Sequence, residues 1–159
     1  MKTSAGILVY KKENNGILFF IAHPGGPFWK NKNIGAWSIP KGEFTLEENA
    51  FDAAIREFEE ETGIKPKGNF IELTPVRLKS GKTIYAWAVE DAIDADNIKS
   101  NEFPIEWPPK SGKFVNIPEI DRCGWFGKKE ALEKLNVAQT AFVIEIFSII
   151  TKIEQNGYR

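Results

Sequence analysis

The segment from Thr45 to Pro66 constrains the fold most, because it carries signals for both ends of one helix. Thr45 and Glu48 have the spacing of a capping box, in which two side chains satisfy free amide groups at a helix start. Gly63 stands where a left-handed residue commonly ends a helix, and Pro66 cannot continue one. We therefore predict a helix over residues 47–62 with its N-cap at Thr45.

The predicted helix has two chemically different faces at about 100° per residue. The apolar face, expected to point to the core, holds Phe51, Ile55, Phe58 and Thr62. The nearly opposite face holds Glu57, Glu60 and Glu61, with the small Ala50 and Ala53 beside them. Like charges at this spacing cost about 0.2 to 0.5 kcal/mol per pair, which a bound cation would offset. Oxygen ligands favour magnesium or manganese over zinc, whereas a solvated acidic face is the alternative for the isolated string EFEEE.

The wider segment GEFTLEENAFDAAIREFEEETGI (42–64) resembles the Nudix box, G-x5-E-x7-R-E-U-x-E-E-x-G-U, where U is bulky and apolar. All its fixed positions are filled, by Gly42, Glu48, Arg56, Glu57, Glu60, Glu61 and Gly63. Only Phe58 departs from the usual aliphatic residue. The resemblance favours the metal site over the solvated face. It implies a Nudix fold of the α/β class, with a mixed sheet between helices, and a metal-dependent pyrophosphohydrolase.

The same resemblance implies roles for individual residues. Glu60 and Glu61 are expected to bind metal, with Glu57 as ligand or general base and the Lys41 carbonyl as a further ligand. Arg56 is expected to pair with Glu48, whose rival role is that of capping-box partner. A carboxylate would then take a proton from a metal-activated water that attacks phosphorus in line.

Three weaker motifs concern the substrate. WSIPKGE (37–43) resembles a segment of diadenosine tetraphosphate hydrolases and diphosphoinositol polyphosphate hydrolases, and KTIYAWAVE (82–90) resembles a strand of the first group that places Lys82 and Tyr85 near the polyphosphate. Glu119, six residues before Trp125, matches a loop glutamate that assists metal or water. The tyrosine expected 16 to 18 residues past the box is absent, as is the proline typical of ADP-ribose pyrophosphatases.

We therefore expect hydrolysis of a nucleoside-diphosphate derivative, with a dinucleoside polyphosphate favoured. Nucleoside triphosphates, nucleotide sugars and diphosphoinositol polyphosphates are alternative substrates. The rival from another class is a non-catalytic nucleotide-sensing module, against which the intact set of Glu57, Glu60 and Glu61 argues.

The rest of the chain predicts a single domain over 1–159. The β-rich runs 5–10 and 17–22 flank Asn15-Gly16, a hairpin-turn signal. Further strands are expected at 70–73, 82–89 and 123–126, and helices at 128–135 and 138–155. Along 82–89, Ile84, Ala86 and Ala88 alternate with Tyr85, Trp87 and Val89. The apolar stripe of the last helix fits core packing, with a dimer seam as the alternative.

Residues 91–118 are expected to form a long loop with four prolines, and such loops are usually functional or mobile. Trp107 in this loop is a candidate for stacking on a substrate base, and covering the edge of the core is its alternative role.

The balance of 21 basic and 22 acidic residues provides no general positive field for nucleic acid, so a small nucleotide is the expected partner. One cysteine and one histidine, Cys123 and His23, exclude an internal disulfide and a zinc cluster, which fits a reducing cytoplasm. Lys11 and Lys12 cut the first apolar run too short for a membrane span. His23 is interpreted as structural. The oligomeric state stays open.

Overall fold

The computed structural model describes residues 2–14 and 16–156 and contains one mixed sheet. Its central strand β1 (Thr3–Glu13) runs antiparallel to β2 (Gly16–Pro24) and parallel to β6 (Thr83–Glu90). The strand order is β4-β6-β1-β2-β9, with β4 (Ile71–Glu72) and β9 (Ile120–Gly127) at the two ends. The short β3 (Lys41–Phe44) pairs with the start of β1, and β5 (Val76–Arg77) pairs with β6. The predicted mixed sheet is confirmed.

The first hairpin is longer than its apolar runs suggest. Residues 4–10 of β1 are buried without a break, as expected for a strand whose two faces are both covered. Glu13 pairs with Gly16 at the turn, and the predicted turn residue Asn15 lies outside the described residues.

Helices cover both faces of the sheet, and β6 shows how the sequence separates them. Ile84, Ala86 and Ala88 belong to the core under α2 (Lys128–Lys134) and α3 (Thr140–Asn156), as the alternating pattern predicts. Trp87 and Val89 face the opposite core, which is covered by α1 (Ala50–Thr62). Two short 3-10 helices, η1 (Ala95–Asn97) and η2 (Val137–Gln139), complete the helical elements of the described chain.

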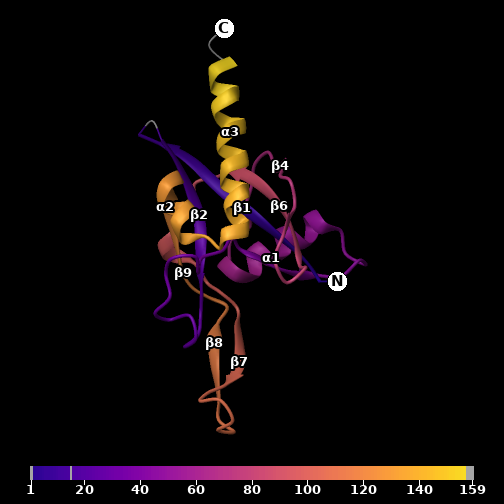
Figure 1. The fold of residues 1–159 in the computed structure, drawn as a ribbon, viewed down its shortest axis with the longest axis vertical. Helices are drawn as coiled ribbons and strands as arrows, with labels where there is room; N and C mark the ends of the chain where they lie inside the picture. Colours follow the sequence, from indigo (N-terminus) through magenta and orange to yellow (C-terminus); the bar gives the residue numbers. More distant parts are fainter. Residues whose placement is uncertain (1, 15, 157–159) are drawn as a thin grey trace.

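The apolar stripe of α3 is core over its first three turns, where Phe142, Val143, Ile146 and Ile150 are buried. Beyond them Ile153 is 60% exposed. In Figure 1 the end of α3 extends past the sheet. Within 2–14 and 16–156, no helix combines the length and apolar character needed to cross a membrane.

The expectation of a structureless loop over 91–118 is wrong. The segment contains η1 and a hairpin of β7 (Glu102–Glu106) and β8 (Phe114–Pro118), which projects from the end of the molecule opposite α3 (Figure 1). Phe103 lies opposite Ile117, and Ile105 lies opposite Val115, so apolar pairs support the ladder. Pro104 is tolerated because both strands of a two-stranded sheet are edge strands.

The predicted start of α1 is also wrong. The helix begins at Ala50, and the Asn49 side chain caps it by accepting hydrogen bonds from the amides of Phe51 and Asp52 at 2.9 and 3.1 Å. The Glu48 carboxylate binds Arg56 instead of completing a capping box with Thr45. At the other end Gly63 is the predicted left-handed cap, with φ 76° and its amide donating to the Glu59 carbonyl.

The difference between the two caps is testable. Asn49→Ala should lower the free energy of unfolding by about 1 kcal/mol, because it leaves two helix amides without their side-chain acceptor. Thr45→Ala is the matched control and should change it by less than about half of that amount. Urea unfolding followed by circular dichroism measures both variants, and a larger loss for Thr45→Ala would restore the capping box.

Candidate metal centre

Three buried or half-buried carboxylates meet beside α1. Glu57 and Glu61 lie one turn apart on the helix and are only 8% and 7% exposed, and Glu119 comes from the link between β8 and β9. One oxygen of each of the three lies within 4.8 Å of the others. We call Glu57, Glu61 and Glu119 the carboxylate cluster. Only oxygen donors converge here, and this donor set suits magnesium or manganese.

The carboxylate cluster is covered by protein rather than open to solvent. The prediction that α1 has one face in the core and an opposite, acidic face is therefore too simple. Gly42 on β3 lies directly against Glu57, and a Cβ atom at this position would overlap the Glu57 carboxylate. Ala53, expected beside the acidic face, is fully buried in the core. The glycine is therefore needed so that β3 can close over the carboxylates.

Burial and mutual repulsion both disfavour the charged cluster. Burial raises the pKa of Glu61 to about 8, although the Lys41 ammonium works against this shift. Burial also raises the pKa values of Glu57 and Glu119, and the nearby Glu60 adds to both shifts. A divalent cation would remove this penalty, so the cluster has the electrostatic character of a cation site.

Arg56 joins the loop before α1 to the helix carboxylates. Its Nε and Nη2 donate to both oxygens of Glu48, each at 2.8 Å, so the expected contact between the two residues is present. Its Nη1 donates to Glu57 at 2.9 Å and to Glu60 at 3.2 Å. Glu60 thus lies beside Arg56 and outside the carboxylate cluster, and its role as a metal ligand stays a prediction.

Lys41 contacts the cluster through its backbone, since its amide donates to Glu61 Oε1 at 3.3 Å. Burial lowers the pKa of the Lys41 side chain, and the neighbouring Lys82 ammonium lowers it further. The predicted use of the Lys41 carbonyl as a ligand stays a prediction.

Long-range backbone contacts hold Glu119 in place. Its amide donates to the Asn101 carbonyl at 2.9 Å, and its carbonyl accepts from the Gly25 amide at 3.0 Å. The Asn101 amide in turn donates to the Glu60 carbonyl on α1 at 3.0 Å, and a Cβ on Gly25 would overlap the Pro118 carbonyl. Residue 101 therefore couples Glu119 to the helix that carries the other two carboxylates. No local pattern in the sequence predicts that Asn101 and Gly25 hold Glu119 in place.

Of the three predicted substrate residues, Lys82 and Tyr85 both contact side chains of β3, and Trp107 lies apart from them. Lys82 lies just before β6, with its Nζ 3.3 Å from Glu43 Oε1, and the Tyr85 ring lies 6.2 Å from that of Phe44 on β3. Trp107 lies at the outer end of the β7–β8 hairpin, about 20 Å of extended chain from Asn101 at about 3.3 Å per residue. The structure brings Trp107 neither to the carboxylate cluster nor to the core edge of its own chain.

His23 is structural, as expected. It is fully buried, and its ring nitrogens contact the Asp121 carboxylate at 2.9 Å and the Lys32 carbonyl at 2.6 Å. The contact fastens the loop after β2 to β9. Sequence reasoning missed Lys2 and Glu43, which meet Lys82 only because β1 pairs with both β3 and β6.

The chain is similar to known proteins in sequence and in fold. The sequence model of the NUDIX domain matches residues 1–144, so the chain belongs to the Nudix family. Nudix hydrolase 6 of Arabidopsis thaliana is 36% identical over 132 residues, which cover 81% of this chain and 44% of that protein. The chain spans less than half the length of the curated relatives it matches.

Two solved structures show the same architecture. An Ap4A hydrolase binary complex from C. elegans has a TM-score of 0.64 at 19% identity and covers 96% of this chain and 98% of its own. The NUDIX domain of Shewanella oneidensis NrtR complexed with ADP ribose has a TM-score of 0.59 at 14% identity, covering 90% and 83%. At such identities the likeness establishes the fold alone.

The buried cluster predicts an unusual pH dependence of stability without metal. Because the pKa of Glu61 is higher in the folded chain than its ordinary value of 4.5, the folded state binds more protons between about pH 4.5 and 8. The free energy of unfolding in chelator should therefore fall by on the order of a few kcal/mol as pH rises through this window. Glu61→Gln should flatten the fall, and the exposed Glu59→Gln should not. Denaturant titrations from pH 5 to 8.5 measure the free energy of unfolding of each variant. An equal decrease with pH in wild type and Glu61→Gln would contradict the raised pKa of Glu61.

Proposed function

We propose that this chain hydrolyses a diphosphate linkage in a nucleoside-diphosphate derivative, using magnesium or manganese. The observation that carries the proposal is the convergence of the buried Glu57 and Glu61 with the half-buried Glu119. The intact cluster also argues against the non-catalytic sensing module, because simple binding of a nucleotide does not require three converging carboxylates, two of them buried.

The metal, when bound, supplies a Lewis acid that neutralises the diphosphate and acidifies a water. Glu57 and Glu119 have raised pKa values, as suits a group that accepts the proton of the attacking water. The hydrogen bond from Arg56 opposes the shift of Glu57, which favours Glu119 as the base. Arg56, which also binds Glu48, holds the Glu57 side chain in its place within the cluster.

The favoured substrate within this proposal is a dinucleoside polyphosphate. The motif WSIPKGE and the position of Lys82 support it, since Lys82 and Lys41 are near enough to interact electrostatically and Lys41 borders the cluster. A chain of several phosphates would reach from the metal to Lys82. ADP-ribose is the second candidate, because the NrtR domain binds it in the same fold.

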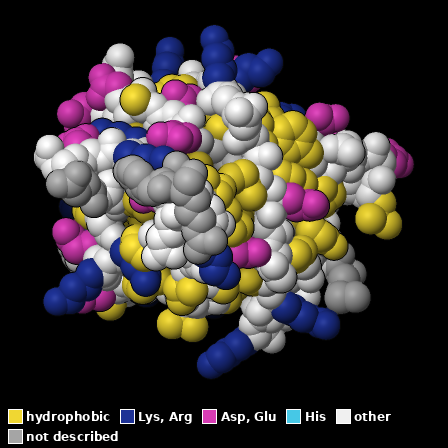
Figure 2. Space-filling view, turned by 90° about the horizontal axis from the view of Figure 1, so that it is seen from above, with side chains coloured by type: hydrophobic (Ala, Val, Ile, Leu, Met, Phe, Trp, Pro, Cys, Tyr) yellow, Lys and Arg dark blue, Asp and Glu magenta, His cyan; other side chains and the backbone are white. Residues whose placement is uncertain are grey.

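The setting of the enzyme belongs to the same proposal. We place residues 1–159 in one domain, acting in the cytoplasm on a small nucleotide rather than on nucleic acid. Figure 2, viewed from the α3 end, shows basic and acidic side chains interspersed across that face, without a continuous basic surface. The single cysteine, Cys123, is compatible with a reducing compartment.

The metal assignment predicts that activity requires magnesium or manganese and that Glu61→Gln lowers kcat by at least about a hundredfold. Glu59→Gln, an exposed change on the same helix, is the control and should keep full activity. Chromatographic analysis of the nucleotide products from a substrate panel, together with a thermal melt of each variant, measures this. Undiminished hydrolysis by a folded Glu61→Gln protein, or full activity in excess chelator, would refute the site.

The substrate assignment predicts a higher kcat/KM for diadenosine tetraphosphate than for ADP-ribose or nucleoside triphosphates. Lys82→Ala should lower kcat/KM for the tetraphosphate by a factor that corresponds to about 1 to 3 kcal/mol of transition-state stabilisation, the range of a charge-assisted contact. The loss of kcat/KM for ADP-ribose should be distinctly smaller. Lys129→Ala on α2 is the control lysine. If ADP-ribose is the better substrate, or both substrates lose equally, the hydrolase proposal stands but the tetraphosphate does not.

A further inference from the structure

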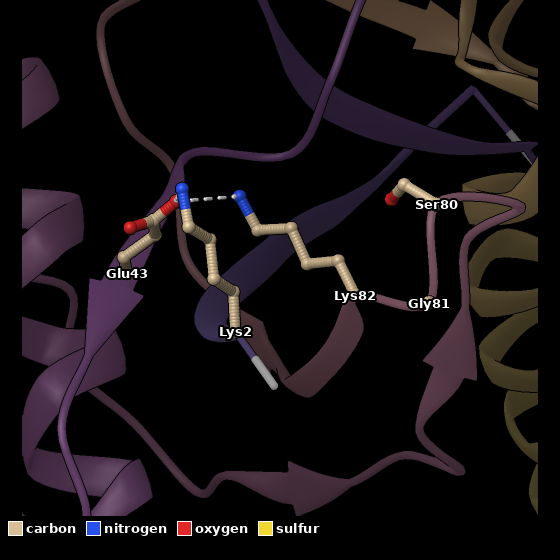
Figure 3. A pocket seen from close by; sticks show the side chains of 5 residues that line it. All are labelled: Lys2, Glu43, Ser80, Gly81 and Lys82. Carbon is tan, nitrogen blue, oxygen red and sulfur yellow. Dashed lines mark hydrogen bonds and ion pairs between the residues drawn. The ribbon is translucent and has the colours of Figure 1, made fainter.

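A small pocket opens beside the start of β1 (Figure 3). It has a volume of about 340 Å³ and is lined by Lys2, Glu43, Ser80, Gly81 and Lys82. The residues come from three segments that the sheet brings together, because Thr3 pairs with both Phe44 and Thr83. The volume lies at the lower end of the range for small-ligand sites.

The charges in this pocket are unbalanced. Lys82 Nζ lies 3.3 Å and Lys2 Nζ 3.9 Å from the same oxygen of Glu43, so one carboxylate serves two ammonium groups. Figure 3 shows both lysine side chains reaching toward that carboxylate. A carboxylate oxygen between two ammonium groups occupies the place that a phosphate oxygen would take. Substitution of one anion for the other would leave both lysines paired.

The pocket is adjacent to the carboxylate cluster along one short strand. On β3 the Lys41 amide donates to Glu61, Gly42 lies against Glu57, and Glu43 follows next. The Lys41 side chain links the two places, because it interacts electrostatically with Lys82 and Glu43 of the pocket and with Glu61 and Glu57 of the cluster. A polyphosphate bound at the metal would pass this lysine on its way to the pocket.

We propose that this pocket is a subsite for the outer phosphates of the substrate's polyphosphate chain, and that Glu43 fills it as an internal anion that the substrate displaces. The proposal rests on the proposed hydrolase function and adds a selection by chain length. A substrate with only two phosphates leaves Glu43 in place. A longer one exchanges Glu43 for its own phosphates and gains both lysines.

Binding of inorganic tripolyphosphate to the metal-free protein in chelator, measured by calorimetry, tests the subsite without any turnover. Glu43→Gln should tighten tripolyphosphate binding by about three- to tenfold, because it removes the competing anion. Lys2→Ala and Lys82→Ala should weaken it by a similar factor. Glu130→Gln and Lys129→Ala, changes of the same charge on α2, should leave the affinity unchanged.

Orthophosphate is the second probe, since a free phosphate would satisfy the same two lysines. It should bind more weakly than tripolyphosphate and respond less to Glu43→Gln. Equal affinity of the two anions, or an effect of Glu43→Gln no larger than that of Glu130→Gln, would overturn the subsite. Because Glu61→Gln turnover tests the hydrolase independently, failure of one proposal is distinguishable from failure of the other.

Discussion

The repulsion among buried carboxylates is the constraint on which the rest of the site depends. Glu57 and Glu61 are buried and Glu119 is half-buried, with one oxygen of each within 4.8 Å of the others, an arrangement that is unfavourable when all three are charged. Two basic residues offset part of this repulsion: Arg56 donates a hydrogen bond to Glu57, and the Lys41 ammonium interacts with Glu61. Neither neutralises the cluster fully, since the pKa of Glu61 still rises to about 8. A divalent cation would neutralise the remaining negative charge and so remove this repulsion.

The same constraint explains the glycines and backbone contacts around the cluster. Gly42 lets β3 approach Glu57, and Gly25 lets the chain after β2 approach Pro118 beside Glu119. Asn101 then ties Glu119 to α1 through two backbone hydrogen bonds. The carboxylates come from places far apart in the sequence, and these contacts keep them together against their repulsion.

The sequence predicts those parts of the fold that have a local cause. The end of α1 follows from Gly63, and the two faces of β6 follow from simple alternation, so both predictions are confirmed. The start of α1 was predicted wrongly because Thr45 and Asn49 are both good caps, and the choice depends on Arg56 holding Glu48. The β7–β8 hairpin was missed because its prolines resemble loop residues unless the strands are known to be edges.

The site is predictable to a similar extent. The box locates Glu57 and Glu61, but the structure adds that Glu119 completes their cluster while Glu60 lies with Arg56. The local sequence does not show that Glu119, rather than Glu60, joins the cluster. That difference depends on the backbone hydrogen bonds by which Lys99 and Asn101 pack against α1 and Asn101 holds Glu119. The pairing of Lys2, Glu43 and Lys82 likewise requires the register of three strands.

Anomalous diffraction from crystals soaked in manganese tests the central claim most directly, because it locates the ion independently of activity. We expect the anomalous peak among Glu57, Glu61 and Glu119, with the Lys41 carbonyl in its coordination shell. A peak bound only by Glu60 and solvent, with neither Glu57 nor Glu61 in contact with the ion, would contradict this account of the site.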